Sequence, residues 1–156
     1  MCNYADINNY LLNTKTNIKI SIFSNSTCNS KNIIYFIYCL KCNLIYIGES
    51  SRTAKIRINE HLSKIRSLRK CLDNSESLFN QRIANSQDSV HLYTHFVHNH
   101  DLTKDFRFQI YMSNFNNYIL RMETDLMYIF NTIYPSGLNK KTCNFMNEYF
   151  ITYPQI

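Results

Sequence analysis

Two apolar runs near residue 40 dominate the hydrophobic pattern of the chain. They span residues 33–39 and 44–48, and the short segment Leu40-Lys41-Cys42-Asn43 joins them. Two β-type runs with so short a connection predict an antiparallel hairpin. The first run is almost continuously apolar, so we expect a strand covered on both faces. Residues 106–112 alternate between apolar and polar positions and predict a third strand.

The remaining hydrophobic pattern is helical. From residue 51 to about 72 an apolar stripe recurs every three or four positions, and shorter helices are expected near 76–85 and 90–98. A last helix begins at a cap, Asn116 or Asn117, and runs to about 133, where Pro135-Ser136-Gly137 ends it. The residues expected to face inward are Ile58, Leu62, Ile65, Leu68 and Leu72 in the first helix and Ile119, Met122, Leu126, Ile129 and Ile133 in the last.

The order of these elements predicts the fold class. It is an α/β (α+β) domain with a small three-stranded antiparallel sheet flanked by helices. We place this domain at residues 32–142. Residues 1–31 are rich in Asn, Ser and Thr and are expected to form a polar lead-in, partly disordered or with one edge strand at 18–22. Residues 143–156 are expected to be a tail.

Charge and composition favour an ordered, basic domain. Hydrophobic residues make up 45% of the chain, which excludes a disordered composition. The net charge of +6 favours a polyanionic partner such as DNA, and a solvated basic surface is the alternative. The chain has only two glycines, so each one is expected to mark a need of the backbone.

The compartment is predicted to be intracellular. No stretch approaches the roughly 18–20 apolar residues of a membrane helix, and residues 1–6 lack the pattern of a secretory signal. The six cysteines are irregularly spaced, which favours thiols or metal ligands over disulfides and hence a reducing environment.

The hairpin carries a recognisable motif. Ile33-Ile34-Tyr35 is followed eleven residues later by Tyr46-Ile47-Gly48, which resembles the signature of the GIY-YIG nuclease family. The resemblance implies a three-stranded antiparallel sheet with helices around it and hydrolysis of DNA phosphodiesters with one divalent metal ion. The first glycine of the signature is replaced here by Ile33. In the family that glycine begins a strand and supplies no catalytic side chain, so the fold is expected to tolerate the change.

Four downstream positions extend the resemblance. The family's helix arginine corresponds to Arg57, its general-base partner to His61, its metal-binding glutamate to Glu123 and its terminal asparagine to Asn139. The resemblance implies that Glu123 holds Mg²⁺ or Mn²⁺ and that Arg57 offsets charge on the phosphate. Asn139 would orient the site through hydrogen bonds.

The two tyrosines complete the implied mechanism. Tyr35, assisted by His61, would deprotonate the attacking water, and Tyr46 would orient water or phosphate. Adjacent strands of one hairpin let the two hydroxyls converge if both side chains face the same side. Arg57 and His61 are four residues apart and therefore share a helix face. Taken singly, such residues are usually packing or surface residues, so their combination carries the prediction.

Within the family, the chain is most similar to the endonuclease domain of Penelope-like retroelements. The resemblance includes residues 28–42, Tyr46-Ile47-Gly48-Glu49-Ser50-Ser51-Arg52 and Tyr134-Pro135-Ser136-Gly137-Leu138-Asn139. In those elements the domain follows a reverse transcriptase, so such a domain is an implied partner, and the nucleus is the implied location in a eukaryote.

The same resemblance implies a structural zinc site. Its ligands would be the two hairpin cysteines and two histidines of the segment 95–100, and four such ligands suit a closed tetrahedral zinc site. The alternative is a pair of buried cysteines beside a histidine-rich loop. The preferred ligands are Cys39, Cys42, His95 and His100, with His98 or His91 as substitutes.

We therefore predict a metal-dependent DNA endonuclease. The alternatives are a catalytically inactive nucleic-acid-binding module that keeps the fold and the basic surface, and a fragment of an element without a role of its own. Only the first requires Tyr35, Tyr46, Arg57, His61 and Glu123 to meet around one cavity.

Overall fold

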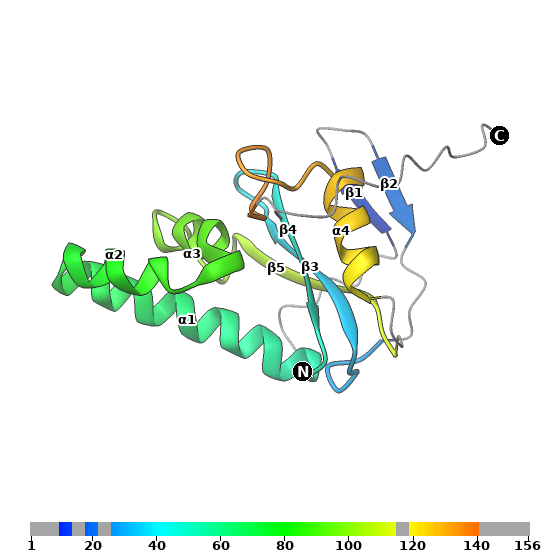
Figure 1. Cartoon of the computed structure of the whole chain (residues 1–156), viewed down its shortest axis with the longest axis horizontal. Coiled ribbons are helices and arrows are strands. Elements are labelled where there is room, and N and C mark those ends of the chain that lie inside the picture. Colours follow the sequence, from blue (N-terminus) through cyan, green and yellow to red (C-terminus); the bar gives the residue numbers. More distant parts are fainter. Residues whose placement is uncertain (1–9, 14–17, 22–25, 115–118, 141–156) are drawn as a thin grey trace.

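A computed structural model describes residues 10–13, 18–21, 26–114 and 119–140 (Figure 1). The main sheet consists of β3 (Ile33–Cys39), β4 (Leu44–Ser50) and β5 (Phe106–Met112). Its strand order is β4-β3-β5, and both pairings are antiparallel. The helices are α1 (Ala54–Asn74), α2 (Glu76–Ala84), a short 3₁₀ helix over Gln87–Ser89, α3 (Val90–Val97) and α4 (Ile119–Ile129). The predicted fold class is confirmed.

The central strand β3 separates two hydrophobic layers. On one face its residues pack with α1, α2 and α3, and on the other face with α4, as the arrangement in Figure 1 shows. Ile33 and Ile37 contribute to the first layer, and Ile34 and Phe36 to the second. Since side chains alternate across a strand, a strand buried on both faces needs apolar residues throughout. The prediction from its continuous apolar run is confirmed.

Helix α1 is the long element that lies along the first layer. Its apolar stripe is buried at Ile58, Leu62, Ile65 and Leu68, as predicted. Thr53 caps its N-terminus, because the Thr53 hydroxyl accepts a hydrogen bond from the Ile56 N–H. The helix thus begins four residues after Ser50, the last residue of β4. This short link holds the first turns of α1 beside the hairpin.

Helix α4 is turned differently from the sequence prediction. Among its residues from Met122 onward, whose burial the structure describes, Leu126 and Met127 are buried, followed by Phe130 just beyond its end, whereas Ile129 is 42% exposed. In a helix of about 3.6 residues per turn, positions 126, 127 and 130 share a side, and 129 lies off its edge. The prediction that Ile129 faces inward is therefore wrong. The predicted cap at 116 or 117 lies outside the described residues, as does the side chain of Ile119.

The structure corrects two predictions about the first 31 residues. A strand is present at Ile18–Ser21 (β2), but it pairs antiparallel with a second strand, Tyr10–Asn13 (β1), in a sheet of its own. Cys28 is disulfide-bonded, so the expectation of thiols is wrong at this position. Spacing along a chain does not show which cysteines meet in space. Cys39, Cys42 and Cys71 are free, as expected.

Among the residues that the structure describes, none of the helices combines the length and the apolar character that crossing a bilayer requires.

Candidate active site and metal site

Tyr35 and Tyr46 lie on the same face of the hairpin. Tyr35 pairs with Gly48 and Ile37 pairs with Tyr46, so the two tyrosines are diagonal neighbours on one side of the sheet. Their ring centroids are 6.3 Å apart, and both side chains are buried beneath α1 and α3. Both side chains therefore face the same side of the hairpin, which the predicted convergence of their hydroxyls requires.

Gly48 makes this arrangement of rings possible. A Cβ atom added at Gly48 would lie 2.5 Å from the Tyr35 hydroxyl oxygen and 2.8 Å from a ring carbon of Tyr46. Both separations are closer than real Cβ contacts, and the backbone at Gly48 does not have a positive φ. Glycine is therefore required for close approach and not for conformational freedom. The Tyr35 ring lies across the position that a side chain would fill.

Helix α1 brings Arg57 and His61 to the Tyr35 hydroxyl. The Nε–H of Arg57 donates to this oxygen at 2.8 Å, and Nε2 of His61 lies 2.8 Å from it. The two residues are one helical turn apart, so they meet the hydroxyl from the same helix face, as predicted. Glu60 supports Arg57 with an ion pair at 3.3 Å and also pairs with Arg52.

Burial and charge set the protonation of this group. Burial raises the pKa of Tyr35 well above its usual value of 10.0, against the lowering effect of the Arg57 guanidinium. The pKa of His61 is lowered well below 6.5 by burial and by the charges of Arg57 and Arg52. At neutral pH the site thus holds a neutral phenol hydrogen-bonded to a neutral imidazole, beside a cationic guanidinium.

Glu123 lies within electrostatic range of both tyrosines. Burial is the main cause that raises the pKa of Tyr46 to about 12, and the Glu123 carboxylate raises the pKa values of Tyr46 and Tyr35 further. Helix α4 packs on the opposite face of the sheet from the tyrosines and mainly against β4. Because β4 is an edge strand, a side chain of α4 can reach the tyrosine side past this edge.

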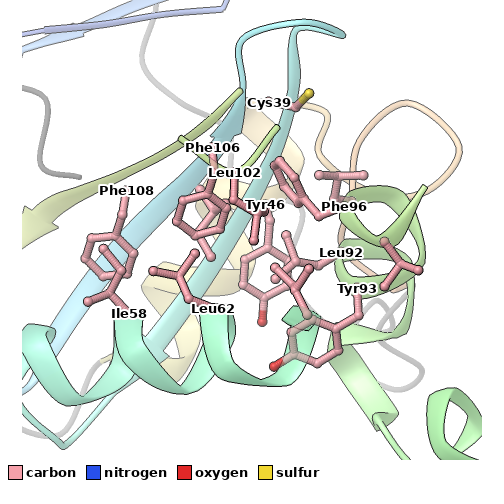
Figure 2. Packing of buried hydrophobic residues seen from close by; sticks show 14 of the residues in the cluster. Cys39, Tyr46, Ile58, Leu62, Leu92, Tyr93, Phe96, Leu102, Phe106 and Phe108 are labelled. Carbon is pink, nitrogen blue, oxygen red and sulfur yellow. The ribbon is translucent and has the colours of Figure 1, made fainter. Parts of the chain in front are cut away.

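Tyr93 and Ser89 also belong to this group, and the sequence prediction missed both. The Tyr93 hydroxyl lies 3.1 Å from Nδ1 of His61, and the Ser89 hydroxyl lies 3.1 Å from the Tyr46 hydroxyl. Both tyrosine rings lie next to the ring of His61, and in Figure 2 the hydroxyls of Tyr46 and Tyr93 lie at the lower edge of the cluster. Tyr93 follows the apolar pattern of α3, so its sequence position indicates only a core residue.

Asn139 is bonded to the backbone of β4 rather than to another site residue. Its Oδ1 accepts the Ile47 N–H at 2.9 Å, and its Nδ2 donates to the Ile47 carbonyl at 2.7 Å. The loop that leads to Asn139 requires a glycine at position 137, because a Cβ at Gly137 would lie 2.3 Å from the Thr132 carbonyl oxygen. Asn139 is buried and fixes the backbone that separates Tyr46 from Gly48.

A separate cluster of four metal-ligand residues lies at the tip of the hairpin. One ligand atom from each of the four lies within 4.8 Å of all the others, and they are Cys39, Cys42, His95 and His100. Figure 2 shows Cys39 at the end of β3, close to Phe96 of α3. Zinc bonded to sulfur at ~2.3 Å and to nitrogen at ~2.0 Å would hold its ligand atoms about 3.5 Å apart. The Cys42 sulfur and Nε2 of His100 already lie 3.4 Å apart.

The chemistry of these four groups fits a cation such as Zn²⁺. Nε2 of His95 is buried without a hydrogen-bond partner, and burial lowers the pKa of this ring to about 4. Nδ1–H of His100 donates to the His98 carbonyl at 2.5 Å, which leaves Nε2 as the ligand atom. Burial raises the pKa of Cys39 to about 11, whereas backbone N–H groups of Cys42 and Lys41 lower it. Such N–H groups would stabilise a thiolate once a metal replaces the proton.

The two substitute histidines lie elsewhere. His98 is exposed, and its ring packs edge-on against Phe79 at 5.9 Å. The His91 ring stacks on Tyr134 at 4.0 Å. The cluster found among the residues that the structure describes contains neither of them.

The sequence comparison identifies the family. The chain matches the GIY-YIG catalytic domain over residues 31–120, which is more than half of its length, and it therefore belongs to this family. The family consists of nucleases. Tyr35, Tyr46, Arg57 and His61 lie within the matched residues, and Glu123 and Asn139 follow them. Comparison with curated proteins and with solved structures gave no match.

Proposed function

We propose that the protein is a metal-dependent endonuclease that hydrolyses DNA phosphodiester bonds. The observation that carries this proposal is the convergence on one hydroxyl group. The Tyr35 oxygen is held by a guanidinium and an imidazole at 2.8 Å each, and the field of the Glu123 carboxylate reaches it. A phosphodiester needs a nucleophile, charge relief at the phosphate and help for the leaving oxygen, and this group offers residues for each.

Tyr35 and His61 are the proposed general base. Since the phenol is neutral at neutral pH, it takes a proton from water only as it passes its own proton on. Nε2 of His61 lies in reach of that proton and belongs to a neutral ring. The attacking water then becomes a hydroxide-like nucleophile, the water proton stays on Tyr35, and the Tyr35 proton stays on His61.

Arg57 and Tyr46 would contact the phosphate of the substrate. The Arg57 guanidinium is half-buried and remains cationic, because a guanidinium does not lose its proton in proteins. Burial lowers its pKa, and the contact with Tyr35 more than offsets that effect. It would offset the negative charge of the phosphate while its Nε–H holds Tyr35. The Tyr46 hydroxyl would orient water or phosphate, and Asn139 would hold the backbone that carries Tyr46.

Glu123 is the proposed ligand of the catalytic metal ion. One carboxylate together with phosphate oxygens and waters suits Mg²⁺ or Mn²⁺. The half-buried position of Glu123 and its effect on both phenols fit this role. A cation at this carboxylate would supply Lewis-acid charge at the phosphate and at the leaving oxygen.

For Cys39, Cys42, His95 and His100 we propose structural zinc. Four protein ligands would close the coordination sphere, which is typical of structural rather than catalytic zinc. The unpaired, buried Nε2 of His95 supports this assignment. The site would tie the tip of the hairpin to α3 and to the loop that follows it.

The combination of the hairpin zinc ligands with the GIY-YIG motif also supports an origin in a Penelope-like retroelement. On that proposal the parent element carries a reverse transcriptase, and the site of action is the nuclear DNA of a eukaryotic host. The net charge of +6 is compatible with DNA as the partner.

Nicking of supercoiled plasmid with Mg²⁺, with Mn²⁺ and with EDTA tests the proposal. The wild type should nick DNA with either cation and not with EDTA, and Glu123→Gln should abolish nicking. Asp125→Asn is the matched control, because Asp125 is an exposed carboxylate of the same helix. Equal nicking by Glu123→Gln and by wild type would refute the metal assignment. DNA binding without nicking by the wild type would instead favour the inactive binding module.

A further inference from the structure

The buried ring of His61 is hydrogen-bonded at both nitrogens. Nε2 faces the Tyr35 hydroxyl at 2.8 Å and Nδ1 faces the Tyr93 hydroxyl at 3.1 Å. We propose that Tyr93 is a positioning residue that holds His61 in the tautomer with its proton on Nδ1, so that Nε2 is free to accept the proton of Tyr35. This inference rests on the proposed function, because it concerns the general base.

The choice of tautomer follows from the donors around Tyr35. Arg57 has no acceptor atom, so its Nε–H must be the donor in its contact with the Tyr35 oxygen. The Tyr35 O–H is then free to donate, and the His61 Nε2 lies in reach. The opposite tautomer would direct two N–H groups at the same oxygen and deprive the Tyr35 proton of this acceptor. Nδ1 of His61 must then carry the proton and donate to Tyr93.

Ser89 extends the same network to Tyr46. Its hydroxyl lies 3.1 Å from the Tyr46 hydroxyl. Burial raises the pKa of Tyr93, and the charge of Arg57 and a hydrogen bond with Ser89 lower it. Ser89 immediately precedes α3, and Tyr93 lies within α3. One short helix with its preceding residue therefore holds the imidazole of His61 and the phenol of Tyr46.

A purely structural role for Tyr93 is the competing interpretation. Tyr93 is only 7% exposed and belongs to the core cluster shown in Figure 2, so its hydroxyl would need a partner in any case. The two interpretations differ in the state of His61. A packing role leaves the tautomer of His61 unchanged when the Tyr93 hydroxyl is removed, whereas a positioning role does not.

The experiment measures the ring ¹⁵N shifts of His61 in protein labelled at histidine, with the signals assigned by their loss in His61→Gln. The wild type should show the Nδ1–H tautomer, and Tyr93→Phe should shift it toward the Nε2–H form. The turnover number for nicking should fall roughly 10²-fold, as for loss of a general base, with KM for DNA nearly unchanged. Tyr111→Phe is the control, because Tyr111 packs on the opposite face of the sheet.

Two results would overturn the inference. One is an Nε2–H tautomer in the wild type, a result that does not depend on whether Tyr93→Phe folds. The other is an unchanged His61 tautomer in folded Tyr93→Phe. The ring shifts are measured without DNA cleavage. A wild type that does not nick DNA but shows the predicted tautomer, with the predicted shift in the variant, would refute the proposed function and support the positioning role of Tyr93.

Discussion

The Tyr35 hydroxyl lies 2.8 Å from Nε2 of His61, although 26 residues separate them in the chain. Tyr35 is in the central strand and His61 is in the helix that covers it, and both side chains are completely buried. This contact joins the signature hairpin to the helix that carries Arg57. Most of the chemistry proposed for the protein depends on this pair.

Gly48→Ala tests the close approach at the hairpin. Glycine to alanine in a strand usually stabilises a protein by about 0.4–1 kcal/mol, because it restricts the unfolded chain. Here the added Cβ would lie 2.5 Å from the Tyr35 oxygen, so the buried ring must move. We expect a net destabilisation of about 1–3 kcal/mol in urea unfolding and a loss of nicking. Glu49→Ala, at the half-buried neighbouring residue, is the control. A Gly48→Ala variant that is as stable as the wild type, or more stable, would contradict the prediction.

Asn139→Asp tests the link between the last described loop and β4. The substitution replaces the Nδ2 donor with an oxygen that faces the Ile47 carbonyl, in a buried position. We expect a loss of about 3 kcal/mol in unfolding free energy and reduced nicking, because a buried acceptor loses its donor. Lys140→Ala, at the exposed neighbouring residue, should stay within about 0.5 kcal/mol of wild type. If Asn139→Asp changed the unfolding free energy as little as Lys140→Ala, the two hydrogen bonds between Asn139 and Ile47 would contribute little to stability.

Acid should destabilise the metal-free protein through its buried neutral histidines. Burial lowers the pKa of His61 well below 6.5, so below that pH the unfolded chain binds a proton that the native protein does not. Stability is therefore fully present above about pH 6.5 and falls below it, by about 1.4 kcal/mol per pH unit while His61 stays neutral. His95, with its pKa lowered to about 4, acts in the same direction.

Urea unfolding with EDTA between about pH 5 and pH 8 measures this dependence. His61→Gln should flatten the slope, and His98→Gln, which changes an exposed ring, should not. If His61→Gln kept the full slope of the wild type, the acid sensitivity would have another source.

Removal of the proposed zinc should lower the melting temperature. A metal ion at a free concentration of 1,000 times its Kd stabilises the native state by about 4 kcal/mol. A chelator removes that contribution. Elemental analysis should find one zinc per chain in the wild type and none in Cys39→Ser or His100→Ala. Cys71→Ser and His98→Ala are matched controls, since neither residue belongs to the cluster. A wild type that is metal-free and equally stable with or without EDTA would contradict the zinc site.

The sequence was sufficient for much of the fold. The strand at 106–112 was predicted with its observed bounds, because apolar and polar residues alternate over 106–110 and two further strand-forming residues follow. The rotation of α4 was not predictable, because both Met127 and Ile129 are apolar and only the sheet beneath decides which is buried. The scarcity of glycine correctly indicated a backbone need at Gly48, but its cause, the ring of Tyr35, is visible only in three dimensions.

The site was less accessible to prediction. Arg57 and His61 share a helix face at fixed spacing, so the sequence could place them together. Tyr93 lies 32 residues from His61, and nothing in an apolar helix of a chain with 12 tyrosines distinguishes the one that reaches a histidine. The choice of His100 over His98 likewise depends on how the chain turns after α3.

Tyr35→Phe in single-turnover plasmid nicking tests the central claim most directly. The variant removes one oxygen atom, and with it the contacts to Arg57 and His61. Tyr128→Phe, at an exposed residue, is the control. We predict that Tyr35→Phe folds and loses about 10²-fold or more in rate while Tyr128→Phe nicks normally. Cleavage at the wild-type rate by folded Tyr35→Phe would contradict the account.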